Sequence, residues 1–326
     1  MSEYYKPKRV KNLYNPLSKE LFRISRSKIA LFMNCPRCFY LDRRLGIGQP
    51  GGFPFSLNSA VDHLLKNEFD GFRAKGETHP LMKEAGIDAV PFKDDRMDEW
   101  RDALQRGCTY AFPQTNLLIT GAIDDIWVKP EGEIIIVDYK ATAKEGEVSL
   151  DADWQISYKR QMEIYQWLFR RNGFKVHPTG YFVYCNGDGC KDVFNCCLQF
   201  DIKLIPYEGD DSWVEGKIKE LYQCLQDQNM PEGSSDCDFC LYRNAVGALA
   251  AENKGQIEEL LALPRKVKID LADKEAHEYC EKTWPEMVNQ MGFCHAFWGE
   301  KKRILKEKYG INWKTPAEEN PGKIYD

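Results

Sequence analysis

The sequence predicts a mixed α/β fold, with a central mixed sheet flanked by helices and a helical C-terminal extension. Two β-rich segments, residues 116–128 and 133–142, flank a turn at residues 129–132 that is typical of a β-hairpin. Apolar residues recur at helical spacing before the hairpin, over residues 56–73, and after it, over residues 153–171. This order places helices around a largely central sheet.

Other elements follow from the same signals. Helical patterns cover residues 25–45, with Ser25 or Ser27 as N-cap, and residues 213–226. Glycine and proline mark residues 46–54 as a loop. Residues 179–185 and 193–205 have the composition of strands. Beyond them we expect helices over residues 245–263 and 274–309, separated by Pro264.

The composition is that of a globular protein. Of the 326 residues, 43% are hydrophobic and 29% are charged, and no apolar run reaches membrane-spanning length. Residues 1–12 are basic and polar and contain no apolar stretch of a secretory signal, so we expect a cytoplasmic protein without a membrane partner. In that compartment the 12 cysteines are interpreted as thiols or metal ligands rather than as disulfides.

Charge is distributed unevenly along the chain. The formal net charge is -5, but residues 1–48 contain 11 Lys and Arg against 3 Asp and Glu. A basic N-terminal region on an acidic body is suited to contact a phosphate backbone. A solvated arm over residues 1–12 is the competing interpretation.

Strand geometry brings three charged residues of the hairpin together. Asp138 and Lys140 point to the same face of their strand, because successive side chains alternate. If the turn is centred near Glu131, Asp124 lies directly opposite Asp138, with Cβ atoms about 5 Å apart. Asp125 then opposes Val137 on the other face of the sheet. Asp124 rather than Asp125 is therefore the expected partner of Asp138.

Two carboxylates and an ammonium on one sheet face suit a bound metal ion. Like charges repel and raise each other's pKa, and Mg²⁺ or Mn²⁺ with its preference for oxygen ligands removes that conflict. A metal-bound water would then attack a phosphodiester, with Lys140 orienting the water or stabilising the developing charge. The alternative is a surface hairpin with an Asp–Lys salt bridge. The apolar run from Ile134 to Val137 indicates instead that the strand is buried.

The hairpin segments GAIDDIWV and EIIIVDYKAT resemble motifs of the PD-(D/E)XK nuclease superfamily, in its RecB-like branch. Gln161 and Tyr165 resemble the Q-x-x-x-Y motif of that branch, which lies beside the active site. The helix SAVDHLLKNEF resembles a G-x-x-x-H helix with Ser59 in place of glycine. By this resemblance His63 helps to bind the metal, and Asp62 is the competing residue.

Two C-x-x-C pairs, Cys35 with Cys38 and Cys237 with Cys240, stand far apart in the sequence. Four thiolates from two such pairs suit a closed tetrahedral Zn²⁺ site or a 4Fe–4S cluster. Neither pair has the strand-to-helix setting of a redox dithiol, which makes that interpretation weaker. A second group of cysteines is interpreted as buried thiols of strands: Cys185, Cys190, Cys196 and Cys197.

The cysteine segments also resemble the iron–sulfur site of some RecB-like nucleases, among them CRISPR-associated and helicase-linked exonucleases. The family usually has one N-terminal and three C-terminal cysteines. Here Cys38 would have to be the fourth ligand, which leaves Zn²⁺ as a serious alternative to the 4Fe–4S cluster.

The resemblance implies three parts: a basic arm over residues 1–20, a nuclease domain over residues 21–243 closed by the four cysteines, and a helical extension over residues 244–326. It implies an exonuclease acting on DNA, with possible partner proteins in a repair or CRISPR-type complex. Three arginines are candidate backbone contacts: Arg37, Arg43 and Arg44. The alternatives are a catalytically silent nucleic-acid-binding protein of this fold and a cysteine-based metal or redox protein.

Overall fold

The computed structural model describes residues 8–52, 56–190, 193–252, 264–288, 290–323 and 325. Its contacts divide the chain into two compact units, Met1–Leu241 and Tyr242–Asp326. The domain boundary expected at residue 243 stays a prediction.

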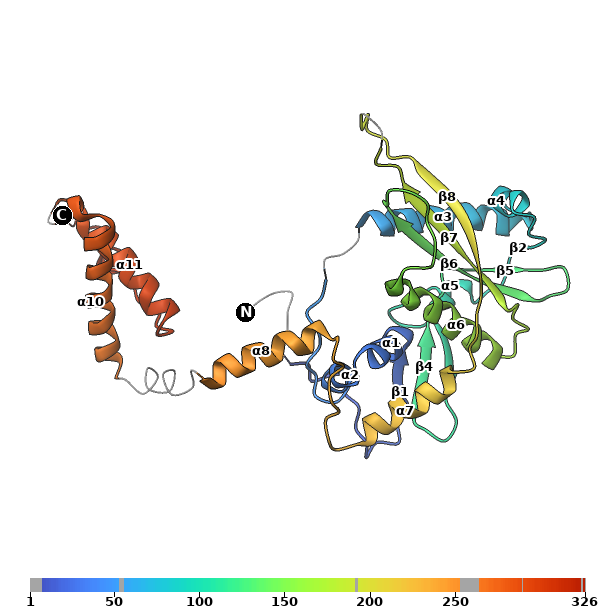
Figure 1. Cartoon of the computed structure of the whole chain (residues 1–326), viewed down its shortest axis with the longest axis horizontal. Helices are drawn as coiled ribbons and strands as arrows, with labels where there is room; N and C mark the ends of the chain where they lie inside the picture. Colours follow the sequence, from blue (N-terminus) through green and yellow to red (C-terminus); the bar gives the residue numbers. More distant parts are fainter. Residues whose placement is uncertain are drawn as a thin grey trace. The chain divides into compact units, whose positions relative to one another are not determined.

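A mixed five-stranded sheet forms the centre of the first unit (Figure 1). Its order is β2 (Val90–Pro91), β5 (Asp125–Val128), β6 (Ile134–Thr142), β7 (Thr179–Gly187) and β8 (Phe200–Glu208). Strands β6 and β7 pair in parallel, and the other neighbours pair antiparallel. The β6–β7 connection contains a helix, as a parallel crossover requires. The predicted mixed α/β class is confirmed.

Two long helices cover the two faces of this sheet: α3 (Ser56–Lys75) and α6 (Ile156–Arg171). Alternation along β6 sends Ile134 and Ile136 into the larger core cluster with α6, and Ile135 and Val137 into a second cluster with α3. Strand β6 is therefore buried on both faces, as its apolar run predicts.

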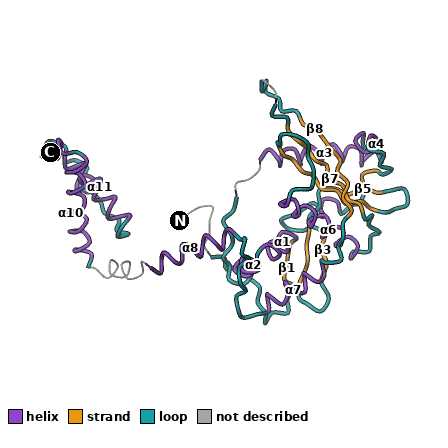
Figure 2. Tube along the Cα trace, in the orientation of Figure 1, coloured by secondary structure: helices purple, strands orange, loops and turns teal. Residues whose placement is uncertain are grey.

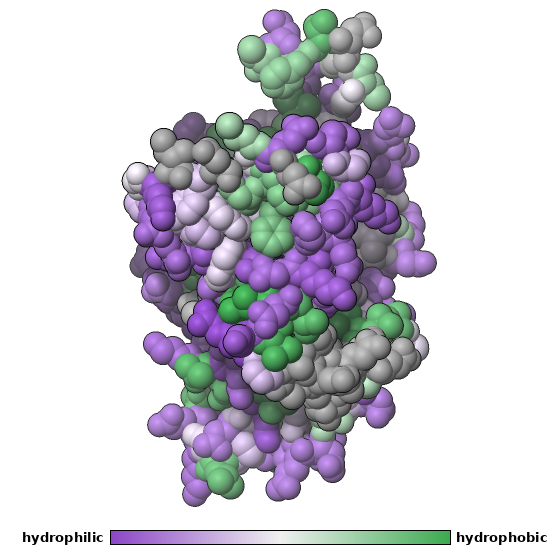
Figure 3. All heavy atoms as spheres, turned by 90° about the vertical axis from the view of Figure 1, so that its left-hand side faces the viewer, coloured by the Kyte–Doolittle hydropathy of each residue, from purple (hydrophilic) through white to green (hydrophobic). Residues whose placement is uncertain are grey.

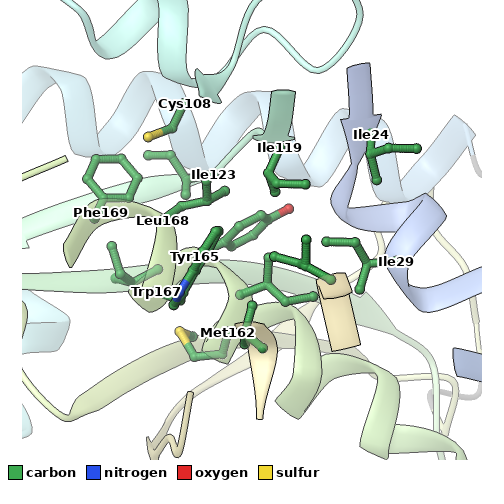
Figure 4. Packing of buried hydrophobic residues seen from close by; sticks show 14 of the residues in the cluster. Ile24, Ile29, Cys108, Ile119, Ile123, Met162, Tyr165, Trp167, Leu168 and Phe169 are labelled. Carbon is green, nitrogen blue, oxygen red and sulfur yellow. The ribbon is translucent and has the colours of Figure 1, made fainter. Parts of the chain in front are cut away.

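A second, three-stranded sheet lies on the far side of α6, with the order β1 (Phe22–Ser25), β4 (Leu117–Gly121) and β3 (Cys108–Ala111). The β-rich segment 116–128 contains two strands, β4 and β5, which belong to different sheets, and only β5 forms the hairpin with β6. Gly121 ends β4 so close to α6 that an added Cβ would lie 2.8 Å from the Tyr165 ring. Figure 4 shows Tyr165 surrounded by Ile119 of β4 and Ile123 of the link to β5.

The predicted N-terminal helix is two helices, α1 (Arg26–Asn34) and α2 (Pro36–Arg43). Proline restricts the residue before it to extended backbone, and Cys35 has φ -160° and ψ 105°. Residues 8–20 are not a detached arm, because Arg9 donates to Asp42 Oδ1 at 2.6 Å and Tyr14 is buried. Residues 1–7 lie outside the described part of the chain.

The shorter elements include α4 (Pro80–Glu84), α5 (Met97–Trp100), η1 (Asp153–Gln155) and α7 (Val214–Gln226). The predicted helix over 213–226 and the strand beginning at Thr179 are confirmed. The strand expected over 193–205 instead begins at Phe200. Asn195 and Cys196 have φ values of 44° and 55°, which form a turn rather than a strand.

The helix α8 (Asp238–Glu252) crosses the boundary between the units (Figure 2). The second unit contains α10 (Arg265–Thr283), η2 (Pro285–Met287), α11 (Phe293–Glu307) and α12 (Pro316–Glu319). The single helix expected over 274–309 is broken after Trp284 by Pro285, and Gly292 at φ 87° precedes α11. Of the helix expected over 245–263, residues 253–263 lie outside the described chain.

None of the helices in the described ranges is long and apolar enough to cross a membrane. On the face drawn in Figure 3, hydrophilic side chains surround smaller apolar groups.

Candidate active site and cysteine cluster

Asp138 and Lys140 lie on the α6 face of β6, as strand alternation predicts. Asp138 is fully buried, and Lys140 Nζ forms an ion pair with its Oδ2. The hairpin pairs Asp125 with Val137, so the expected register is confirmed. Asp124 immediately precedes β5, and its Oδ2 accepts a hydrogen bond from the Tyr139 backbone N–H at 2.9 Å. The backbone pairing therefore holds Asp124 beside Asp138.

Asp125 points to the other face of the sheet, where ion pairs and a hydrogen bond within the protein hold its carboxylate. Its carboxylate is fully buried and forms ion pairs with Arg73 and, at 3.1 Å, with Arg101. It also accepts a hydrogen bond from Tyr139 Oη at 2.8 Å. Arg101 Nε donates to the Asp124 carbonyl oxygen at 2.9 Å, so this network also fixes the backbone of Asp124.

Helix α6 supplies Gln161 as a hydrogen-bond donor to Asp138, and Tyr165 contacts Gln161 in turn. Gln161 Nε2 lies 2.6 Å from Asp138 Oδ1 and 3.2 Å from Tyr165 Oη. Burial raises the pKa of the Asp138 carboxyl to about 6, Lys140 opposes the rise and Asp124 adds to it. The structure thus brings together Asp124, Asp138, Lys140, Gln161 and Tyr165.

Helix α3 brings Asp62 to the same place. Lys66 Nζ lies 2.8 Å from Asp62 Oδ2 and 3.5 Å from Asp124 Oδ1, between the two carboxylates. His63 is exposed, and its Nε2 lies 3.1 Å from Asn67 Nδ2. Neighbouring positions on a helix point about 100° apart, so Asp62 and His63 do not face the same side.

A hollow of about 370 Å³ joins these groups. Asp62, Asp124, Lys140 and Gln161 line it, and His63 is not among its lining residues. Sequence reasoning missed three further lining residues: Arg26, Asn58 and Tyr158. Tyr158 lies three positions before Gln161 on the same helix, so helical spacing was a usable signal for it. Arg26 and Asn58 gave no such local signal.

The residues around this hollow fit a hard divalent cation. Asp138 Oδ2 is buried, faces Lys140 as an ion pair and has no hydrogen bond of ordinary geometry to any described residue. Asp124 and Asp62 contribute further carboxylate oxygens, which are the ligands that Mg²⁺ and Mn²⁺ prefer. The position between Asp62 and Asp124 already holds a positive charge, the Lys66 ammonium.

The two C-x-x-C pairs meet in the first unit. The Sγ atoms of Cys35, Cys38, Cys237 and Cys240 all lie within 4.8 Å of one another, so this cluster could hold a metal ion. Three of the Sγ–Sγ distances are 3.6, 3.6 and 3.7 Å. Gly233 leaves room for the cluster, because an added Cβ there would lie 2.9 Å from Cys240 Sγ.

Hydrogen bonds prepare one of these thiols for deprotonation. Burial opposes the charge, but the backbone N–H groups of Cys38 and Ser234, together with neighbouring thiols, lower the pKa of Cys35 to about 6. In the same cluster burial raises the pKa of Cys38 to about 12. Thiolates, not thiols, bind metal ions, so the arrangement favours one negative charge before a cation is added.

The second group of cysteines, expected to be buried thiols of strands, is divided between the core and the surface. Cys185 is buried on β7, and burial raises its pKa to about 11, as expected for a thiol of the core. Cys190, Cys196 and Cys197 are exposed, so the prediction that they are buried is wrong. They lie between β7 and β8 in the turn that replaces the expected start of the strand.

The three candidate backbone arginines make contacts within the protein. Arg37 pairs with Glu232 at 2.6 Å, and Arg43 Nε donates to Asp42 Oδ2 at 2.8 Å. Arg44 Nη1 donates to the Leu225 carbonyl oxygen at 2.5 Å. Arg37 and Arg44 therefore attach α2 and its C-terminal end to other segments, and Arg43 pairs within α2.

A buried aspartate and a lysine on one strand, with a second carboxylate across a hairpin, fit the arrangement expected of a metal-dependent nuclease. The profile of the PD-(D/E)XK nuclease superfamily matches residues 57–245, and the chain belongs to this superfamily. Its members use divalent metal ions. No curated protein matches the chain.

One solved structure, titled "Crystal structure of SSO0001", aligns with 68% of this chain and 84% of its own at 16% identity. The TM-score of this alignment is 0.29.

Proposed function

We propose that this chain is a deoxyribonuclease of the RecB-like branch, with an active site at Asp124, Asp138 and Lys140. The observation that carries the proposal is the fully buried Asp138 carboxylate, held by Gln161 and paired with Lys140. Burying a charge costs stability unless it is compensated, so a site of this kind is more often functional than structural.

Asp124 and Asp138 would hold Mg²⁺ or Mn²⁺, and Asp62 is the α3 residue that we assign in place of His63. A bound divalent ion supplies a nucleophilic water at neutral pH and polarises the phosphodiester. Lys140 orients that water or stabilises the charge that develops on the phosphate oxygens. Gln161, itself in contact with Tyr165, keeps the Asp138 carboxylate in position.

A polyanionic substrate fits the surface beyond the hollow. Arg26 lines the active-site hollow and also a second hollow, which contains Arg106 and Ser25. Ser25 also lines a third hollow, of about 440 Å³, which contains Arg23. Each hollow shares lining residues with the next, and each has an arginine in its lining, which supports a path for a phosphate backbone.

For the cysteine cluster we propose one structural Zn²⁺ rather than a 4Fe–4S cluster. Four sulfurs around one Zn²⁺ at about 2.3 Å stand about 3.8 Å apart at the corners of a tetrahedron. The three Sγ–Sγ distances of 3.6 to 3.7 Å fit that size. A 4Fe–4S cluster puts a separate iron on each cysteine and holds the sulfurs further apart.

The test of the proposed function is cleavage of labelled DNA by the full chain. Single-stranded, linear duplex and closed circular DNA are incubated with Mg²⁺, Mn²⁺ or a chelator. The proposal expects cleavage that requires the metal ion, and circular DNA reports whether a free end is required. Binding of DNA without any cleavage would support the catalytically silent alternative, and cleavage that persists in the chelator would overturn the metal mechanism.

A further inference from the structure

Trp154 is a large apolar side chain left in solvent beside the active site. It is 59% exposed, whereas the other seven tryptophans, all within the described ranges, are buried or half-buried. Trp100, Trp127 and Trp167 are buried in the core. An exposed tryptophan forgoes the stabilisation that its burial would provide, so its position calls for an explanation.

Two ring contacts connect Trp154 to the catalytic lysine. The Trp154 and Tyr158 rings lie 5.3 Å apart at an interplanar angle of 82°. Tyr158 lines the active-site hollow, and Lys140 Nζ lies 4.7 Å from the centre of its ring. Trp154 does not itself line the hollow, but it contacts a residue that does and is one ring removed from Lys140.

The turn before α6 is held by the neighbouring residue, Gln155, rather than by Trp154. The buried Gln155 side chain accepts from the Ala152 N–H at 2.9 Å and donates to the Ser149 carbonyl oxygen at 2.6 Å. These two bonds close the turn before α6. The Trp154 indole has no comparable burial, so maintaining this turn does not explain the residue.

We propose that Trp154, supported edge-to-face by Tyr158, is a stacking platform for a nucleobase next to the scissile phosphate. A base inside a duplex has both faces covered by its neighbours, whereas an unpaired base has a face available for an aromatic side chain. The platform therefore selects DNA that is single-stranded or frayed at the site of cleavage. This inference deepens the proposed function and rests on it for the position of the scissile phosphate.

The test measures DNA binding, so it does not depend on cleavage. Short labelled oligonucleotides are titrated with the full chain carrying Asp138→Asn, to prevent turnover, alone or with Trp154→Ala, Trp154→Phe or Leu17→Ala. Leu17 is a matched control because it is apolar and 90% exposed, away from the hollow. A second readout is the quenching of a 2-aminopurine base when it stacks on an aromatic ring.

Loss of the platform should weaken single-strand binding by about fivefold to a hundredfold in Trp154→Ala. Trp154→Phe should retain most of the affinity, and Leu17→Ala all of it. Blunt duplex should bind all four proteins about equally, and 2-aminopurine quenching should be lost only in Trp154→Ala. Equal single-strand binding by Trp154→Ala and its parent, or an equal loss on single strand and blunt duplex, would overturn the inference.

The two proposals fail in different ways. If wild-type protein does not cleave DNA but Trp154→Ala still loses single-strand affinity and quenching, the nuclease function fails and the platform stands. If wild-type protein cleaves DNA and the Trp154→Ala variant shows an unchanged KM for single strands, the function stands and the platform fails.

Discussion

Gln161 Nε2 lies 2.6 Å from Asp138 Oδ1, so an amide on helix α6 holds the carboxylate of strand β6. The bond occupies one oxygen of Asp138 and leaves Oδ2 facing Lys140. Partners of this kind orient a metal ligand and set its basicity. Under the proposed function Gln161 is a positioning residue, and its removal should disturb the metal site without removing a ligand.

Replacing Gln161 with alanine should lower DNA cleavage or Mn²⁺ affinity by about tenfold to a hundredfold. The amide would no longer restrain Asp138, and Oδ1 would lose its donor. Titrating the cleavage rate against Mn²⁺ concentration separates a loss of Mn²⁺ affinity from a loss of maximal rate. A positioning defect at the metal site raises the Mn²⁺ concentration that gives half of the maximal rate. Tyr165→Phe is the matched variant and should have a smaller effect, since it leaves Gln161 in contact with Asp138. A Gln161→Ala protein with the wild-type Mn²⁺ titration would contradict this role.

Lys66→Met should increase the affinity for Mn²⁺ by about fivefold. The Lys66 ammonium lies between Asp62 and Asp124, where it competes with a metal ion for the same carboxylates. Methionine retains the length of the side chain without the charge. Mn²⁺ binding followed by calorimetry measures the change, and Lys83→Met, on α4, serves as the control for lost charge. Weaker Mn²⁺ binding by Lys66→Met would mean that the lysine supports the site rather than competing at it.

Stabilisation by Mn²⁺ should appear only above about pH 6. The pKa of Asp138 is raised from 3.8 to about 6 in the folded protein. The folded state thus holds a proton that the unfolded chain releases, and the resulting stability is complete below about pH 4 and lost as the pH rises through 6. A cation that binds the ionised carboxylate compensates for that loss. The Mn²⁺-induced rise in Tm should therefore be large near pH 8 and small near pH 5.

The control for this pH dependence is Asp138→Asn, which has no carboxyl to titrate at this position. Its Tm should respond little to Mn²⁺ at either pH. An equal rise in Tm at both pH values in the wild-type protein would show that Asp138 does not determine metal binding.

Cys237→Ser should release the metal of the cysteine cluster and lower the Tm. Structural Zn²⁺ sites contribute directly to folding, because the assembled site exists only in the folded state. Elemental analysis should find about one zinc per wild-type chain and little in the variant. Cys196→Ser replaces an exposed cysteine outside the cluster and should retain the zinc. A brown preparation that contains iron and loses its visible absorption in Cys237→Ser would instead support the 4Fe–4S cluster.

The parts of the site predicted from sequence follow from local geometry. Strand alternation places Asp138 and Lys140 on one face, and the turn fixes the register that pairs Asp125 with Val137. Helical spacing does the same for Gln161 and Tyr165, which are one turn apart. Each of these relationships depends on a single hairpin or helix.

The failures involve contacts between distant segments. Whether Asp62 or His63 faces the hollow depends on the rotation of α3 against the sheet, which its own sequence does not determine. The division of residues 116–128 between two sheets depends on the packing of this segment against α6, where Gly121 makes a close approach. The roles of Arg26 and Lys66 likewise arise from neighbours far away in the chain.

The most direct test of the central claim compares Asp138→Asn with Asp201→Asn in metal-dependent DNA cleavage. Asp201 is an exposed aspartate of β8 and controls for the substitution itself. With purified full-length proteins, labelled DNA and Mn²⁺, we expect Asp201→Asn to cleave at the wild-type rate and Asp138→Asn to show no cleavage above background. Cleavage by Asp138→Asn at the wild-type rate would contradict an active site built on Asp138.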